Sequence, residues 1–279
     1  MSFKRPSWMY LCFFCFIFQI NAFELNDLRL GVSYQTGRFI RIDRDYLDFN
    51  VFLPVEIKDL DVFIDLDGYR FNDGKWGAST GIGIRKELSD GCVLGLNAYY
   101  DYLRGRGRFS FHQVGVGFEM LSDCFDVRIN GYLPVSEKVH SHQCLSFHYS
   151  GTDFHASRCK LEYAYRGLDA EIGKPLLTYY DFDLYGAAGP YYFYRRNFKH
   201  FCGGYARLEV DWKSILSVGV QASYDKFNAI RLQGIFAVSI PLDFCKIGAI
   251  CEDSSLFLQN VRRNGVILTD HCWDWEWNW

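Results

Sequence analysis

Histidines and cysteines gather between residues 140 and 159, and these are residue types that bind transition metals. Imidazole nitrogens and thiolates are good ligands for zinc and copper. The residues are His140, His142, Cys144, His148, His155 and Cys159. Structural zinc sites usually show tighter, paired ligand spacings, whereas this spacing is irregular. We therefore predict no metal site, and we interpret the segment as a polar exposed loop in which Cys144 and Cys159 form a disulfide.

Three arginines separated by glycines form a second candidate site, made of Arg104, Arg106 and Arg108. Guanidinium groups bind phosphates and sulfates, so these residues could contact lipopolysaccharide or a polyanion of a host. Three charges attract such ligands only weakly over distance in salt, and we interpret the segment as a solvated loop. The whole chain has 30 Lys+Arg against 33 Asp+Glu, a net charge of −3 that argues against a nucleic-acid partner.

Catalytic chemistry would need a nucleophile and a base that are held together. Ser110 and His112 are the nearest such pair, and nothing in the sequence orients them. Carboxylates are numerous, and we expect them to pair with arginines in the interior of the fold. They are Asp48, Asp65, Asp67, Asp101, Glu119, Asp181 and Asp183. We predict that the protein is not an enzyme, with no catalytic residue and no cofactor.

The segments that carry these residues alternate between apolar and polar side chains. In residues 204–212, Ala206, Leu208 and Val210 alternate with Arg207 and Glu209. Runs of this kind recur along residues 28–242 and predict about twelve strands of roughly 8–17 residues, with no helical period between them. Many of these runs are long enough for a tilted membrane strand, which needs about 9–11 residues.

The connections between the strands alternate between short turns and longer loops. We expect tight turns at residues 58–60, 88–91, 122–124, 174–177 and 213–214, and longer loops at residues 36–44, 71–75, 104–109, 136–158 and 195–201. This sorting is typical of outer-membrane barrels, whose apolar faces meet lipid and whose polar faces line a lumen. We predict an all-β transmembrane antiparallel β-barrel. The alternative is a soluble β-protein with the apolar face packed in its core.

The beginning of the chain has the features of a signal peptide. Lys4 and Arg5 precede an apolar run over residues 9–20, and Ala22 is a small residue suited to cleavage. That run spans only about 18 Å as a helix, too short for a membrane anchor. We predict a signal peptide over residues 1–22. In an exported chain the eight remaining cysteines favour disulfides, whose pairing the sequence does not reveal. They are Cys92, Cys124, Cys144, Cys159, Cys202, Cys245, Cys251 and Cys272.

An ordered series of motifs resembles the β-domain of the inverse autotransporters, the intimin and invasin family of outer-membrane proteins. The series is Asn97-Ala-Tyr-Tyr-Asp101, Arg104-Gly-Arg106, Val114-Gly-Val-Gly-Phe-Glu119, Val127-Arg-Ile-Asn-Gly-Tyr-Leu133, Ala170-Glu-Ile-Gly-Lys-Pro175 and Val261-Arg-Arg-Asn-Gly-Val-Ile-Leu268. The resemblance implies a 12-stranded barrel in the cell outer membrane. It also implies that the segment with Val261, Arg262, Arg263 and Asn264 returns through the lumen as a linker.

The resemblance leaves two functional hypotheses. Only 11 residues follow Leu268, so we expect residues 23–244 to form a barrel and residues 245–279 to form a linker, plug or tail without a passenger domain. The first hypothesis is a translocator-like barrel. The second is a disulfide-stabilised structural or adhesive barrel whose loop at residues 136–158 contacts a host or envelope protein. Expected partners of either are outer-membrane lipid with its lipopolysaccharide and the barrel-assembly machinery.

The last residues alternate strictly between tryptophan and polar residues, from Cys272 to Trp279. They suit a short strand, an anchor at the membrane boundary or a terminal aromatic signal for barrel assembly. Phe244, near the end of the last expected strand, suits the assembly signal equally well.

Overall fold

The computed structural model describes residues 28–57, 60–89, 91–105, 109–135, 140–148, 155–198, 200–241 and 256–278. The expected signal peptide at residues 1–22 lies outside the described residues, as do Arg106, Arg108, Phe244, Cys245 and Cys251. Within the described part, no α-helix is long and apolar enough to cross a membrane.

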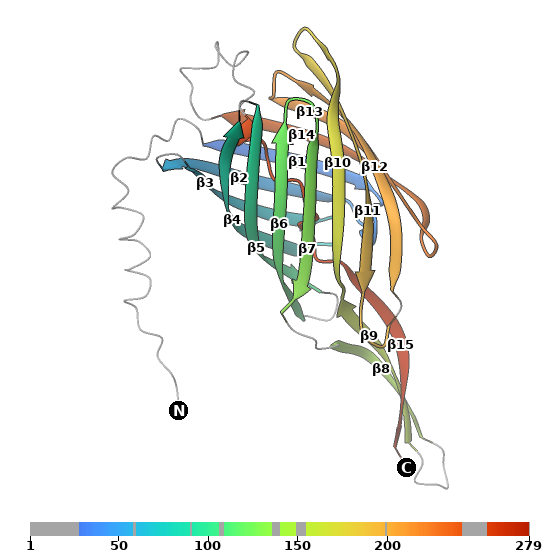
Figure 1. Ribbon diagram of the computed structural model, residues 1–279. Coiled ribbons are helices and arrows are strands. Elements are labelled where there is room, and N and C mark those ends of the chain that lie inside the picture. The colour runs from blue at the N-terminus through green and yellow to red at the C-terminus, as the bar shows by residue number, and fades with distance from the viewer. Residues whose placement is uncertain are drawn as a thin grey trace, which may run out of the picture.

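Twelve antiparallel strands close into a barrel (Figure 1). Around the barrel they follow the order of the chain, except that β7 pairs directly with β10 and β1 closes the ring against β14. The strands are β1 (Arg29–Gly37), β2 (Tyr46–Ile57), β3 (Leu60–Phe71), β4 (Trp76–Ser89), β5 (Cys92–Arg104), β6 (Ser110–Ser122), β7 (Asp126–Pro134), β10 (Arg166–Tyr179), β11 (Phe182–Tyr194), β12 (Phe201–Trp212), β13 (Leu216–Asp225) and β14 (Ala229–Pro241). The all-β closed barrel predicted from the sequence is confirmed.

Side chains alternate between the interior and the outer face along each strand. In β5, Val93, Tyr99 and Leu103 are buried inside the barrel, whereas Leu96 and Tyr100 are 55% and 49% exposed on the outside. Closure gives every barrel strand a hydrogen-bonded neighbour on both sides, as a sheet in hydrocarbon requires. The exposed outer face is therefore the surface suited to lipid.

The orientation of the apolar face decides between a membrane barrel and a soluble one. Leu208, Val210 and Val238 are 49%, 40% and 40% exposed and point away from the interior. A soluble β-protein would pack these side chains in a dry core. Their exposure on the outer face excludes that alternative and agrees with a membrane barrel.

Replacing Leu208 with Arg should destabilise the barrel strongly, since it places a charge on the outer face of β12 well inside its ends. A cationic side chain at the lipid-facing midplane costs about 2–4 kcal/mol, and near the interface about 0–1 kcal/mol. The control is Tyr224→Arg, which is also on the outer face but next to the end of β13. The midpoint of heat-modifiable migration on SDS gels measures both. Equal stability of the two variants would contradict a lipid-facing surface.

The two ends of the barrel differ. After Ile57, Ser89, Ser122, Tyr179 and Trp212 only two or three residues separate one barrel strand from the next, and we call this the short-turn end. The turn at residues 213–215 begins with Lys213 and Ser214, both with positive φ (52° and 53°), a geometry that follows the right-handed twist of a hairpin. The opposite, long-loop end carries the other connections and the chain between β7 and β10.

The segment at residues 136–158, expected to be a polar exposed loop, contains one strand and the beginning of another. β8 (His140–His148) and β9 (His155–Ala164) form a hairpin, and β15 (Thr269–Asn278) adds a third strand beside β9. This small sheet extends from one end of the barrel (Figure 1). β9 ends at Ala164, and the next barrel strand begins only at Arg166. The partner that completes this sheet is more than a hundred residues away, so local sequence gave no sign of it.

The prediction of a turn at residues 174–177 is wrong, because β10 continues through these residues to Tyr179. Pro175 suggested a turn, since proline cannot donate to a sheet ladder and usually lies at sheet edges or bulges. In the structure the register of β10 against β11 shifts between Pro175 and Leu177. On its other side, β10 is paired with β7 only as far as Gly173. The proline thus lies at a bulge beside an unpaired edge, where the missing N–H is tolerated.

Candidate functional site

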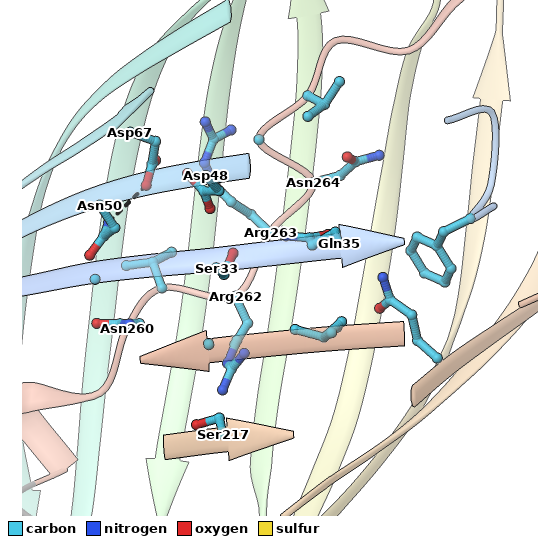
Figure 2. Close-up of a pocket in the computed structure, with 18 of the residues that line it drawn as sticks. Ser33, Gln35, Asp48, Asn50, Asp67, Ser217, Asn260, Arg262, Arg263 and Asn264 are labelled. Atoms are coloured by element: carbon cyan, nitrogen blue, oxygen red, sulfur yellow. Dashed lines mark hydrogen bonds between the residues drawn. The ribbon is translucent and has the colours of Figure 1, made fainter. Parts of the chain in front are cut away.

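A segment of chain without strand structure runs through the barrel between its two ends (Figures 1 and 2). We call residues 256–268 the lumen segment. It begins with the 3₁₀ turn η2 (Leu256–Leu258) at the short-turn end, where Arg29 Nη1 donates a 3.2 Å hydrogen bond to the last carbonyl oxygen of η2. Residues 266–268 are buried, and the Tyr165 N–H donates a 2.9 Å hydrogen bond to the last carbonyl oxygen of the lumen segment.

Arg85 lies at the entry to this path. Its Nε donates a 2.6 Å hydrogen bond to Glu119 Oε1, and the two side chains are 0% and 2% exposed. The guanidinium carbon lies 4.8 Å and 5.9 Å from the ring centres of Phe63 and Phe52. Arg85 Nη1 also donates to the carbonyl oxygen of Phe257, so a barrel ion pair contacts the lumen segment directly.

Arg263 is the most enclosed charge of the lumen segment, with 5% of its side chain exposed. It pairs with both carboxylate oxygens of the fully buried Asp101, and its Nη2 donates a 2.6 Å hydrogen bond to Ser79 Oγ. Its guanidinium lies 3.8 Å from the centre of the Tyr99 ring. A Cβ on Gly81 would lie 2.1 Å from that ring. The Tyr99 ring fits here because glycine has no side chain.

Arg262 points to the opposite wall. Its Nη2 lies 2.9 Å from Glu209 Oε2, while its own side chain is 37% exposed to the lumen. Glu209 is 3% exposed and is also 3.7 Å from Arg207 Nη1. Asn130 Nδ2 donates a 3.1 Å hydrogen bond to the Arg262 carbonyl oxygen, so the backbone here is held as well.

Val261 and Asn264 complete the four residues that the resemblance implied for a linker. The Asn264 N–H donates a 2.8 Å hydrogen bond to the Tyr132 hydroxyl, and Val261 lines the same cavity as its three neighbours. Figure 2 shows Arg262, Arg263 and Asn264 projecting from one coil inside the ring of strands. The structure therefore places all four residues in the lumen.

A cavity of about 260 Å³ remains beside the lumen segment. An acidic cluster of Asp48, Asp65 and Asp67 lines it, and Asn50 Nδ2 donates 2.7 Å hydrogen bonds to one oxygen each of Asp65 and Asp67 (Figure 2). Tyr99 donates a 2.6 Å hydrogen bond to the other Asp65 oxygen. We expected these carboxylates to pair with arginines, but their hydrogen-bond donors here are the amide of Asn50 and the phenol of Tyr99. Across the described residues, no group of three His, Cys, Asp or Glu side chains is placed to hold a metal ion.

A hydrogen-bonded cluster fixes the chain where it leaves the barrel. Asp270, at the start of β15, pairs with Arg41 and accepts a 3.1 Å hydrogen bond from the Tyr165 hydroxyl. Arg41 Nη1 donates a 3.0 Å hydrogen bond to Asn228 Oδ1. Burial is the largest influence on Tyr165 and raises the pKa of its hydroxyl, which therefore stays protonated and can donate. Four separate segments of the chain meet at this point.

Beyond this cluster, β15 pairs with β9 from Thr269 opposite Ala164 to Asn278 opposite His155. Cys144 and Cys159 form a disulfide that joins β8 to β9. In the part of the chain that the structure describes, Cys92, Cys124 and Cys202 are free thiols. The side chains of the histidines in this hairpin lie outside the described residues.

Ser110 and His112 do not contact each other as a catalytic pair would. The Tyr100 hydroxyl lies 2.7 Å from His112 Nδ1, and the Tyr102 hydroxyl lies 3.0 Å from Ser110 Oγ. Sequence reasoning also missed Arg41, Asp270 and Arg85. Arg85 lies at an inward position of β4, which the strand period alone could have identified.

A family model described as "Inverse autotransporter, beta-domain" matches residues 23–173. No curated protein matches the chain. A solved structure reported as "Unveiling the Mechanism Behind the in-meso Crystallization of Membrane Proteins" has a TM-score of 0.62 at 20% identity, covering 88% of this chain and 100% of that one. At this identity the likeness shows the fold.

Two further solved structures have lower scores. The KdgM porin in complex with disordered oligogalacturonate has a TM-score of 0.43 at 5% identity, over 76% of this chain and 97% of that one. Outer membrane phospholipase A from Escherichia coli has a TM-score of 0.41 at 10% identity, over 77% and 97%.

Proposed function

Because this chain belongs to the inverse autotransporter β-domain family, whose barrels lie in the cell outer membrane, we propose that the barrel holds residues 256–268 as a translocated linker. In this proposal the short-turn end faces the periplasm and the long-loop end faces outward. The terminal strand β15 is then displayed at the cell surface on the hairpin of β8 and β9. The barrel acts as a translocator and display scaffold and not as a catalyst.

The observation that carries this proposal is the unbroken series of contacts along the lumen segment. Arg29, Arg85 and Arg128 bind its first residues at the short-turn end, with Arg128 Nη2 donating a 3.0 Å hydrogen bond to Gln259 Oε1. Asp101 and Glu209 bind its middle, and Arg41 and Tyr165 bind the residue that follows its exit. A segment that blocked the lumen from one side would not need partners at both ends.

Surface access to the C-terminal strand tests this proposal. An epitope placed after Trp279 should bind antibody on intact cells. The matched control carries the same epitope in the turn at residues 213–215, at the opposite end of the barrel, and should bind antibody only after the outer membrane is permeabilised. An epitope after Trp279 that is reached only in permeabilised cells would refute the proposed path.

The domain division follows from the same proposal. Residues 1–22 act as a cleaved export signal, residues 23–244 as the barrel, and residues 245–279 as linker and surface tail. The barrel-assembly machinery would then read the last barrel strand, β14, because β15 pairs with β9 outside the barrel. Sequencing the N-terminus of the purified protein tests the first part, since a start at Met1 contradicts it.

A second candidate function is contact with a host or envelope protein through the surface sheet. The observation that favours it is the disulfide between Cys144 and Cys159, which cross-links β8 to β9 in the hairpin that pairs with β15. A cross-link that closes a loop of about 15 residues contributes about 3 kcal/mol of local stability. The double variant Cys144→Ser/Cys159→Ser should therefore expose the hairpin to trypsin while the barrel still migrates as folded. An unchanged rate of cleavage by trypsin would show that the disulfide does not stabilise the sheet.

A further inference from the structure

Two arginines flank a tryptophan on the outer face at the long-loop end. Arg70 of β3 lies opposite Trp76 of β4 in the sheet register. The next pair, Gly77 with Leu103, brings Trp76 opposite Arg104 of β5 when the same register is continued by one residue. All three side chains of the row are exposed, while the inward positions beside them are buried. Two cations and an indole thus lie side by side and point away from the lumen.

The level of this row in the membrane is marked by its aromatic neighbours. Trp76 packs against Tyr102 with ring centres 4.7 Å apart, and Tyr102 packs against His112 at 5.3 Å. The Tyr100 hydroxyl lies 2.7 Å from His112 Nδ1, and Tyr100 lies two residues further into the membrane than Tyr102 along β5. Such belts of Trp and Tyr lie at the boundary between hydrocarbon and headgroups. Arg70 and Arg104 lie at the outer edge of this belt, at headgroup depth.

Among the described residues, the guanidinium groups of Arg70 and Arg104 are not paired with a carboxylate. Nearby, Arg44 and Lys75 both pair with Asp73, at 2.8 Å and 3.7 Å. Among the residues that the structure describes, Arg70 and Arg104 have neither a hydrogen-bond nor an ion-pair partner. Strands in a sheet are about 4.8 Å apart, so the two side chains start about 10 Å apart with one strand between them. Their guanidinium groups can therefore reach one ligand placed over Trp76.

We propose that Arg70 and Arg104 clamp a phosphate group of lipopolysaccharide over Trp76, on the outer surface of the barrel. Guanidinium groups bind phosphate through paired, charge-assisted hydrogen bonds, and two cations at headgroup depth match the charge of a phosphorylated glycolipid. The indole face contacts the sugar or acyl part of the same molecule. This site rests on the orientation in the proposed function, which places the long-loop end in the outer leaflet, but it does not involve the lumen segment.

Lipopolysaccharide retained by the purified barrel in detergent, counted by native mass spectrometry, tests the clamp. The variant Arg70→Gln/Arg104→Gln should retain at least about tenfold less than the unaltered protein, because the loss of even one charge-assisted hydrogen bond weakens binding by on the order of a factor of ten. The matched control is Lys86→Gln/Lys174→Gln, which removes the same charge from outward positions near the short-turn end of β4 and β10. The control should retain as much as the unaltered protein. Equal loss in both variants, or no loss in the first, would overturn the clamp.

A second measurement does not depend on the folding of any variant. Lipopolysaccharide treated with phosphatase should bind the unaltered barrel about tenfold more weakly than the phosphorylated form, for the same reason. Equal binding of the two forms would show that phosphate is not the ligand. Phosphatidylglycerol in mixed micelles should not displace lipopolysaccharide at equal concentration, and displacement would show a site for any anionic lipid, contrary to the proposal.

Discussion

Replacing Arg263 with Met is expected to weaken the hold of the lumen segment by about 3–5 kcal/mol, the usual effect of breaking a buried ion pair. The loss is large because Asp101 is fully buried and keeps only the hydroxyl of Ser79 and the amide of Gln113 as donors. The lumen should then open to ions, so the current through single barrels in planar bilayers should rise. The unaltered barrel should stay largely closed.

The adjacent residue supplies the control for this prediction. Arg262→Met removes the same charge from the same segment, but its side chain is 37% exposed. Because Arg262 contacts water and the buried Glu209 keeps Arg207 Nη1 at 3.7 Å, the loss should be smaller than for Arg263→Met, and the current should change less. The double variant Asp101→Asn/Arg263→Met should recover part of the lost stability, because it removes the carboxylate left without its partner. Equal currents from the two single variants would contradict the role of Arg263 as the principal anchor.

Replacing Arg85 with Met is expected to destabilise the barrel itself, by about 3–5 kcal/mol for the same physical reason. The ion pair with Glu119 joins β4 to β6 across the intervening β5, and both side chains are almost fully buried. The remaining Glu119, with 2% of its side chain exposed, would lose the arginine with which it pairs. The midpoint temperature of heat-modifiable migration should fall clearly below that of the unaltered protein.

Glu119→Gln/Arg85→Met is the informative companion, since it removes both charges and should restore much of the midpoint temperature. Lys86→Met, the neighbouring residue on the outward face of β4, is the matched control and should leave the midpoint nearly unchanged. If Arg85→Met and Lys86→Met behave alike, the inward ion pair does not stabilise the barrel.

The candidate site could be predicted only in part from the sequence. The motif around Arg262 and Arg263 implied a segment inside the lumen, and inward carboxylates such as Asp101 and Glu119 could be found from the strand period. Which carboxylate each arginine meets could not be found. Asp101 and Arg263 are 162 residues apart, and the pairing depends on the path of a coil that has no repeating pattern.

The sequence by itself determined the barrel, because alternation with a period of two is a local property that already assigns each side chain to lipid or to lumen. The same local information placed a turn at Pro175, where only the pairing of β10 with its two neighbours shows that the strand continues. Only the tertiary structure decided that residues 140–148, 155–164 and 269–278 form one sheet outside the barrel. That sheet exists because a non-periodic segment carries β15 through the lumen to β9, and contacts between such distant residues leave no repeating signal in the chain.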